Sequence, residues 1–173
     1  MTTYIAVNCI IEIERHSNQK WEYDRVNDKL VLDRVLKYPY FYPYAYGFIP
    51  NTIGNDGDEL DIVLISDKKY ENWNVSNQII DAFIVGGLMM QDEKGRDDKI
   101  FVVPLDEIEH YEKKQKSDVS VIQENIKWFF SNYKSQDDDK WSKVYGFLDK
   151  DAAEQVFKEA RFDYEYKLEQ KSG

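Results

Sequence analysis

Residues 55–65 read NDGDELDIVLI, an acidic turn that leads directly into an uninterrupted apolar segment. The run from Ile62 to Ile65 is typical of a short buried strand. Asp56, Asp58 and Asp61 stand at the start of that strand. Three like charges this close repel one another, and a divalent cation among them removes the repulsion. Because the donors are all carboxylates, with no His or Cys, the pattern favours magnesium, manganese or calcium over zinc.

The acidic turn leaves two interpretations open. In an extended chain Asp56 and Asp58 share one face and Asp61 faces away, so Gly57 is the candidate for a turn that brings all three together. An EF-hand is excluded, because its required glycine and glutamate positions hold Asp61 and Asp67. A solvated acidic turn without a metal is the alternative.

A second acidic segment, MQDEKGRDDK, covers residues 90–99. We predict a hairpin whose two-residue turn is Lys94-Gly95. That register places Asp92 opposite Asp97, and directly opposed aspartates destabilise a hairpin unless a cation lies between them. The alternative is an exposed, charged hairpin tip that binds nothing.

Cationic side chains are predicted on a hairpin upstream of these segments. Lys20 and Glu22 are two residues apart on one strand and therefore point to the same side. On the next strand, Arg34 shares a face with Leu30 and Leu32, which points it toward apolar neighbours. An inward guanidinium needs an anion, and its planar fork suits phosphate. The alternative is an internal ion pair, with Asp33, Glu12 or Glu22 as the partner.

Phenol and ammonium groups elsewhere in the chain are further candidate donors to phosphate oxygens. They lie in the aromatic segment 37–50 and at the end of a predicted helix; they are Tyr42, Tyr46, Tyr133 and Lys134. The alternative for any one tyrosine is packing with its hydroxyl at a wet edge.

Strand-like segments fill the first two-thirds of the chain, and helical periodicity follows. The predicted strands cover residues 4–13, 20–26, 29–35, 62–65, 79–90 and 98–103. The second and third of these form a hairpin that turns at Asn27-Asp28. Residues 37–50 are predicted to be an aromatic loop. One helix runs from Val119 to Tyr133 after a cap at Ser117 or Asp118, and another begins near Asp149 or Asp151. This order predicts an α+β fold, mainly β, with a small closed or partly closed sheet. We predict that residues 1–173 form one domain and that the tail over 169–173 is frayed.

Composition narrows the range of partners. The net charge of −10 disfavours nucleic acid and anionic membranes as partners.

The single cysteine, Cys9, falls in an alternating apolar pattern and is predicted to be core. His16 and His110 have no evident Ser or Cys partner, so a nucleophilic triad is not expected. With no signal peptide or membrane span in the sequence, we expect a cytoplasmic protein.

Taken in order, these segments resemble the soluble family I inorganic pyrophosphatases. The string DGDELD at 56–61 matches that family's signature, which is Asp, a small or polar residue, Asp, Pro or Glu, a hydrophobic residue, and Asp. The resemblance runs from about residue 7 to about residue 147 and includes IEI at 11–13, KWE at 20–22, LDR at 32–34, FYP at 41–43, YGF at 46–48, DEKGRDDK at 92–99, YK at 133–134 and WSKV at 141–144.

The resemblance implies magnesium-dependent hydrolysis of pyrophosphate to two orthophosphates by direct in-line attack of an activated water. It implies metal ligands at Asp56, Asp61, Asp92 and Asp97, with Glu12 and Glu22 holding a further ion through water. Asp58 resembles the carboxylate that takes the proton of the attacking water. The groups that grip substrate and product phosphate would be Lys20, Arg34, Tyr46, Tyr133 and Lys134, with Tyr42, Lys99 and Lys143 in support. Several Mg²⁺ ions per site are implied, with Mn²⁺ as a substitute.

The family fold is a small five-stranded OB-like β-barrel flanked by C-terminal helices, and its members assemble as homo-oligomers, with a hexamer favoured over a dimer at this chain length. Three positions depart from common family residues: Ala45, Glu59 and Arg96. Two rival functions stay open. One is hydrolysis of another phosphoanhydride, such as a nucleoside polyphosphate; the other is an OB-like module that binds without turnover.

Overall fold

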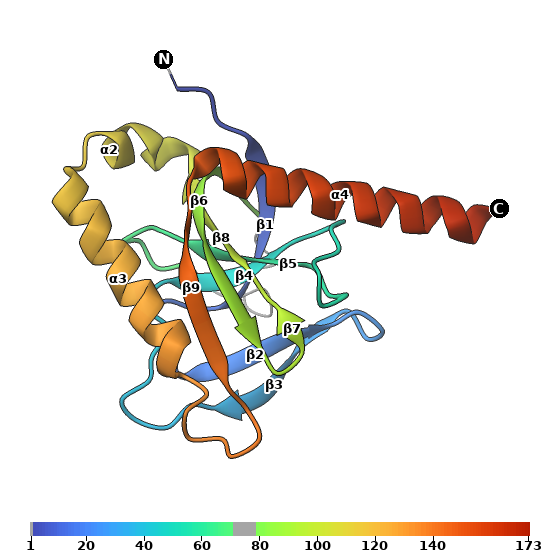
Figure 1. Ribbon diagram of the computed structural model, residues 1–173, viewed down its shortest axis with the longest axis horizontal. Coiled ribbons are helices and arrows are strands. Elements are labelled where there is room, and N and C mark those ends of the chain that lie inside the picture. Colours follow the sequence, from blue (N-terminus) through green and yellow to red (C-terminus); the bar gives the residue numbers. More distant parts are fainter. Residues whose placement is uncertain (1, 71–78) are drawn as a thin grey trace.

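The computed structural model describes residues 2–70 and 79–173, and these form a closed, mixed β-barrel with helices on its outside (Figure 1). Within the described residues five strands close the barrel in the order β1 (Ala6–Ile13), β4 (Ala45–Ile49), β5 (Leu60–Leu64), β8 (Lys99–Pro104), β6 (Ile79–Asp92) and back to β1. Among these five described strands β5 and β8 run parallel, and the other pairs are antiparallel. This confirms the predicted five-stranded barrel.

Alternation in the sequence explains how the barrel is filled. Along β1, Val7, Cys9, Ile11 and Ile13 point inward and are buried, which confirms the interpretation of Cys9 as core. All six residues of β8 are buried, because this strand has neighbours on both sides and helices outside. Burial of apolar area of this kind is the main stabilising contribution to a small barrel.

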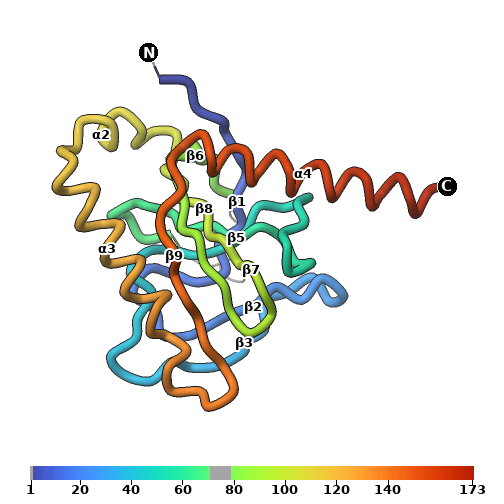
Figure 2. The backbone as a smooth tube through the Cα atoms, viewed as in Figure 1, coloured from blue at the N-terminus to red at the C-terminus, as the bar shows by residue number. Residues whose placement is uncertain are grey.

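The remaining elements lie outside the barrel. Strands β2 (Gln19–Asp24) and β3 (Lys29–Val35) form a separate two-stranded sheet, while β7 (Gly95–Arg96) and β9 (Ser142–Leu148) extend the sheet along β6. Figure 2 shows the β2–β3 hairpin at the end of the molecule opposite the N-terminus. The helical elements are η1 (Leu105–Glu107), α2 (Ile108–Glu112), α3 (Lys116–Asn132) and α4 (Lys150–Ser172).

Two helices close the ends of the core. Phe129 and Phe130 of α3 are buried with Tyr42 and Tyr46 in one apolar cluster. Ala153 and Ala160 of α4 are buried in a second cluster against β1, β5 and β6, and the rest of α4 extends away from the barrel to the C-terminus (Figure 1). None of the described helices is long and apolar enough to cross a membrane.

Several boundaries differ from the sequence predictions. The predicted aromatic loop over 37–50 is wrong for its last part, because β4 covers Ala45–Ile49 and pairs with β1 and β5 on both sides. The tight turn at Asn27-Asp28 is instead a four-residue loop, since Asp24 pairs with Lys29. Strand β9 and helix α2 were not predicted.

The predicted helix ends also need correction. Helix α3 begins at Lys116 with Gln115 as its N-cap, so neither Ser117 nor Asp118 caps it. Asp149 does cap α4, since its carboxylate accepts a hydrogen bond from the N–H of Ala152 at 2.8 Å. The tail predicted to fray from residue 169 is helical as far as Ser172.

Candidate active site

An open cleft of about 380 Å³ lies where the β2–β3 hairpin faces the barrel. Its walls come from β2 and β3, the acidic loop before β5, the β6–β7 turn and the residues after α3. Almost every residue singled out in the sequence lines it: Glu12, Lys20, Glu22, Arg34, Tyr46, Asp56, Asp58, Asp61, Asp92, Asp97, Lys99, Tyr133 and Lys134. The two acidic segments therefore meet in one cleft, together with cationic side chains.

Lys99 occupies the centre of the acidic group. Its Nζ donates to Oδ2 of Asp61 and to Oδ2 of Asp97, each at 2.7 Å. The parallel ladder sets this arrangement, because Asp61 on β5 pairs directly with Lys99 on β8. Burial alone would lower the pKa of Lys99, but the two carboxylates outweigh it and hold that pKa well above its ordinary value. Burial raises the pKa of Asp97 to about 7, despite the ammonium beside it.

The loop before β5 folds back on itself and presents its aspartates to the cleft. The N–H of Gly54 donates to the carbonyl of Asp58 at 2.7 Å, and the N–H of Asp58 donates to Oδ1 of Asp56 at 3.0 Å. Gly57 adopts a φ of +89°, which favours glycine, as expected of the residue that makes the turn. Burial raises the pKa of Asp56.

The second acidic segment reaches the cleft in a register that was not predicted. Asp92 pairs with Gly95, so Glu93-Lys94 forms the turn and Asp92 does not lie opposite Asp97. Oδ2 of Asp92 instead accepts a hydrogen bond from Nζ of Lys134 at 2.9 Å. Burial would raise the pKa of Asp92, but the hydrogen bond and charge of Lys134, the N–H of Lys94 and the charge of Lys99 together outweigh it and lower that pKa.

The cationic groups of the hairpin are held by carboxylates. Nζ of Lys20 lies 2.6 Å from Glu22 and 3.0 Å from Asp33. Arg34 pairs with Asp137, and its Nε lies 3.8 Å from Asp33. The alternative of an internal ion pair for Arg34 is thus correct as to Asp33, although Asp137 was not foreseen. Nε of Arg34 is buried without a hydrogen-bond partner in the described part of the chain.

A β-bulge presents Glu12 to the cleft. Ile11 pairs with Gly47 and Ile13 with Tyr46, so Glu12 is an extra residue on β1. Bulges of this kind commonly redirect a side chain near a functional site. Oε2 of Glu12 accepts a hydrogen bond from the N–H of Tyr23 at 2.9 Å. Burial, together with the charge of Asp61, raises the pKa of Glu12 to about 8.

Two of the supporting residues named in the sequence do not line the cleft. Tyr42 is 1% exposed and packs beneath it, with its ring 4.6 Å from that of Phe129 and 5.4 Å from that of Tyr46. Lys143 lies on β9 with its Nζ 5.1 Å from the ring of Tyr145. The cleft also contains Asp33 and Glu93, which sequence reasoning had not assigned, although each adjoins an assigned residue.

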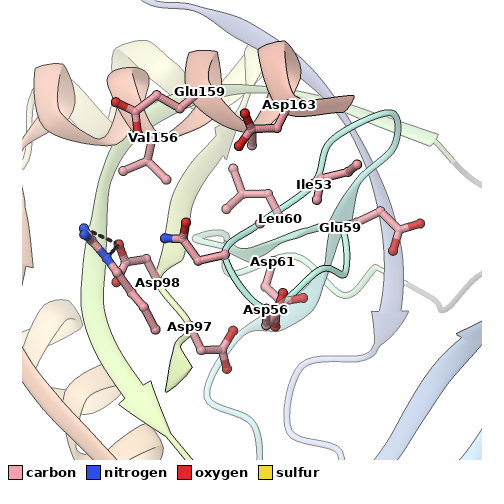
Figure 3. A pocket seen from close by; sticks show the side chains of 14 residues that line it. Ile53, Asp56, Glu59, Leu60, Asp61, Asp97, Asp98, Val156, Glu159 and Asp163 are labelled. Carbon is pink, nitrogen blue, oxygen red and sulfur yellow. Dashed lines mark hydrogen bonds and ion pairs between the residues drawn. The ribbon is translucent and has the colours of Figure 1, made fainter. Parts of the chain in front are cut away.

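A smaller cavity of about 60 Å³ lies behind the acidic loop, against α4. Figure 3 shows Asp56 and Asp61 next to each other and Asp97 coming from a second element. All three line both this cavity and the cleft. The three carboxylates therefore lie between the cleft on one side and the small cavity against α4 on the other.

The donor set fits a hard divalent cation. The converging groups are carboxylate oxygens, which magnesium, manganese and calcium prefer. As the side chains stand, no three His, Cys, Asp or Glu residues of the described ranges are close enough together to enclose one ion. Instead, lysine ammonium groups form ion pairs with several of these carboxylates. The carboxylates are therefore already arranged around positive charge.

Comparison with known proteins agrees with this geometry. The family described as inorganic pyrophosphatase matches residues 9–165. This chain belongs to the inorganic pyrophosphatase family. It is 40% identical over 154 residues to the inorganic pyrophosphatase of Helicobacter pylori, covering 87% of each chain, and 38% identical over 164 residues to that of Nanoarchaeum equitans, covering 92% of this chain and 98% of the relative. The solved H. pylori pyrophosphatase superposes with a TM-score of 0.83 at 39% identity, covering 92% of this chain and 94% of the other.

Proposed function

We propose that this member of the inorganic pyrophosphatase family hydrolyses pyrophosphate to two orthophosphates with the help of magnesium ions. The observation that carries the proposal is the meeting of Asp61 and Asp97, each 2.7 Å from Nζ of Lys99, in a cleft whose facing wall bears Lys20 and Arg34. Carboxylates suit divalent cations, and the facing cations suit a diphosphate. The cleft thus has complementary groups for both.

Pyrophosphatases of this family are generally metal-dependent, and the residues present fit such ions. Asp56, Asp61, Asp92 and Asp97 would ligate them directly, while Glu12 and Glu22 would hold a further ion through water. Magnesium fits this oxygen-only set best, and manganese would substitute for it. When bound, the ions supply positive charge at the phosphate oxygens and acidify the attacking water.

Asp58 is the proposed general base. The hydrogen bonds within its loop use its backbone N–H and carbonyl, which leaves the carboxylate directed to the cleft. The carboxylate orients a water against one phosphorus and accepts its proton as the new phosphorus–oxygen bond forms. The bridging phosphorus–oxygen bond breaks in line with the attack, and no covalent enzyme intermediate forms.

The cationic and phenolic groups hold the other phosphate. Lys20, Arg34 and Lys134 each form an ion pair with a carboxylate that lines the cleft, so phosphate oxygens would exchange for those partners. The buried Nε of Arg34 has a free donor for this purpose among the described residues. Tyr46 and Tyr133 line the same space and offer hydroxyl donors. Charge that develops on the leaving phosphate is stabilised by these groups.

Phosphate release from pyrophosphate with magnesium, assayed beside ATP, tests the proposal. We expect release from pyrophosphate, little from ATP, no activity in excess EDTA, and recovery when magnesium is restored. Equal turnover of ATP would favour a nucleoside polyphosphate as substrate. Binding of metal or phosphate without turnover would favour a binding module. Full activity in the chelator would contradict metal-assisted hydrolysis.

We also propose a cytoplasmic homo-oligomer, with a hexamer favoured over a dimer. Trp128 of α3 supports an interface, because it is 50% exposed and stacks on Tyr40 at 5.7 Å, whereas the adjacent Phe129 is buried. Exposed aromatic pairs of this kind are common at protein contacts. Sedimentation velocity distinguishes the assemblies, and a monomer at micromolar concentration would contradict both.

A further inference from the structure

Arg25 and Glu59 form an ion pair across the mouth of the cleft. Arg25 follows β2 at the tip of the hairpin, and Glu59 lies in the acidic loop between Asp58 and Leu60. Nε and Nη2 of Arg25 donate to Oε1 and Oε2 of Glu59, so the guanidinium holds both carboxylate oxygens. A two-point contact fixes orientation as well as distance.

The pairing directs Glu59 away from the other acidic residues. Its side chain is 18% exposed, against 52% for Arg25, so Glu59 is the more enclosed partner. Figure 3 shows the side chain of Glu59, which borders the small cavity, pointing away from Asp61. Although Glu59 stands between two of the proposed functional aspartates, its charge is neutralised by Arg25 at the tip of the hairpin.

The pair joins the two walls of the cleft. The hairpin bears Lys20, Glu22 and Arg34, and its strands form a sheet of their own, outside the barrel ladder. The opposite wall is the loop with Asp56 and Asp58. Arg25 and Glu59 also border a second hollow of about 450 Å³ beside the end of α4, so the pair separates that hollow from the cleft.

We infer that Arg25 and Glu59 are a positioning pair for the reaction. The pair sets the separation between the substrate-gripping side chains of the hairpin and the carboxylates of the acidic loop. In this role the two residues act through those side chains and not on the reacting atoms. The inference rests on the proposed function and gives a role to Glu59, one of the three positions that depart from common family residues.

Three variants and one control test the pair. The variants are Arg25→Gln, Glu59→Gln and the double variant, and the control is Lys68→Gln, which breaks the exposed ion pair with Asp106 at 3.1 Å. Each is assayed for kcat and KM with magnesium pyrophosphate, and each metal-free protein is titrated with magnesium by calorimetry. Thermal unfolding is recorded for all of them.

A positioning pair predicts that both single variants lower kcat/KM by about tenfold and weaken magnesium binding. The double variant should be no worse than either single one, because the same contact is lost. Midpoints of unfolding should stay within about 4 °C of the unmodified chain, since an exposed ion pair contributes little to stability. The control should behave as the unmodified chain.

Three results would overturn the inference. Unchanged kinetics and metal binding in both single variants would make the pair incidental. Opposite effects of Arg25→Gln and Glu59→Gln would show that only net charge matters. Additive losses in the double variant would show two independent roles. If the unmodified chain releases no phosphate, the proposed function fails, while the calorimetric comparison still decides whether the pair positions the metal-binding loop.

Discussion

Nζ of Lys99 lies 2.7 Å from Oδ2 of Asp61, its partner across the only parallel ladder among the barrel strands of the described residues. Lys99 is 1% exposed, and its Nζ also lies 2.7 Å from Oδ2 of Asp97. It therefore holds two proposed metal ligands together through one oxygen of each. The site is arranged by a permanent cation before any metal binds.

This arrangement predicts that Lys99→Met is most harmful when metal is absent. Removing the ammonium leaves Asp61 and Asp97 close together without a counter-charge, which costs about 3–5 kcal/mol. Magnesium should recover part of that loss, so its addition should raise the unfolding midpoint more in the variant than in the unmodified chain. Denaturant unfolding in EDTA and in magnesium measures both effects.

Lys68→Met is the matched control, because its ion pair with Asp106 is exposed and distant from the cleft. The control should lose almost no stability in either buffer. Equal destabilisation of Lys99→Met with and without magnesium would contradict the view that the lysine substitutes for missing positive charge.

Asp58→Asn should abolish most turnover and leave the fold intact. The change keeps the shape of the side chain and the backbone hydrogen bonds of the loop, but it removes the proposed proton acceptor. A lost general base lowers kcat by about 10²- to 10⁴-fold. Steady-state kinetics and circular dichroism check the two expectations, with Asp67→Asn as an exposed control. Normal turnover would rule out Asp58 as the base.

Arg34→Ala should raise KM and lower kcat, because the guanidinium is proposed to hold phosphate in the ground state and more strongly in the transition state, where charge develops on the leaving group. Asp137→Asn should do the opposite to KM, since Asp137 competes with phosphate for Arg34. Pyrophosphate saturation curves at fixed magnesium distinguish the two. If neither constant changes in Arg34→Ala, the residue serves structure alone.

The pKa of Glu12, raised to about 8 by burial, predicts a pH-dependent stability in EDTA. Between its ordinary value of 4.5 and about 8 the folded state keeps a proton that the unfolded state has lost. The free energy of unfolding should therefore fall as pH rises through that range, by up to about 1.4 kcal/mol per pH unit from this group. Thermal melts between pH 5 and 9 record the slope.

Glu12→Gln removes this titration but keeps the size of the side chain. The difference in midpoint, variant minus unmodified chain, should increase as pH rises, and the variant should be the more stable protein near pH 9 in EDTA. Parallel curves for the two proteins would contradict a proton held on Glu12. In magnesium the variant should lose its advantage, because the proposed outer metal contact is gone.

The barrel was predictable where apolar alternation is strong. Strand β1 shows this best, since Val7, Cys9 and Ile11 follow the expected inward pattern. Strand β4 was missed because Pro39 and Pro43 precede it and Gly47 interrupts it, which resembles a loop in sequence. Its five residues are buried by neighbours on both sides, a tertiary effect that no local pattern reveals.

The members of the site were predictable, but their pairings were not. The sequence indicated Asp92 and Asp97 as partners across a hairpin, whereas the turn at Glu93-Lys94 sends Asp92 toward Lys134. The partner of Asp92 thus moves by two residues, from Asp97 to Gly95, which keeps the face of the side chain but changes its neighbour across the hairpin. Asp137 was missed as the partner of Arg34, because 103 positions separate them and only the fold brings the loop after α3 to the hairpin.

Gly47 of β4 lies so close to strand β1 that this position requires a glycine. A Cβ at this position would lie 1.9 Å from the carbonyl oxygen of Ile10, and the clash is with backbone that cannot rotate away. The close approach is next to the bulge that presents Glu12. We expect Gly47→Ala to lose about 3 kcal/mol of stability, which lowers the unfolding midpoint by about 6–12 °C. Gly146→Ala is the control, because its nearest neighbour is the flexible Cε of Met89 at 3.9 Å. The Gly47→Ala variant should also bind magnesium more weakly, since moving β1 away from β4 displaces Glu12. A variant with a lowered unfolding midpoint but normal magnesium binding would show that Gly47 serves packing alone and not the geometry of the site.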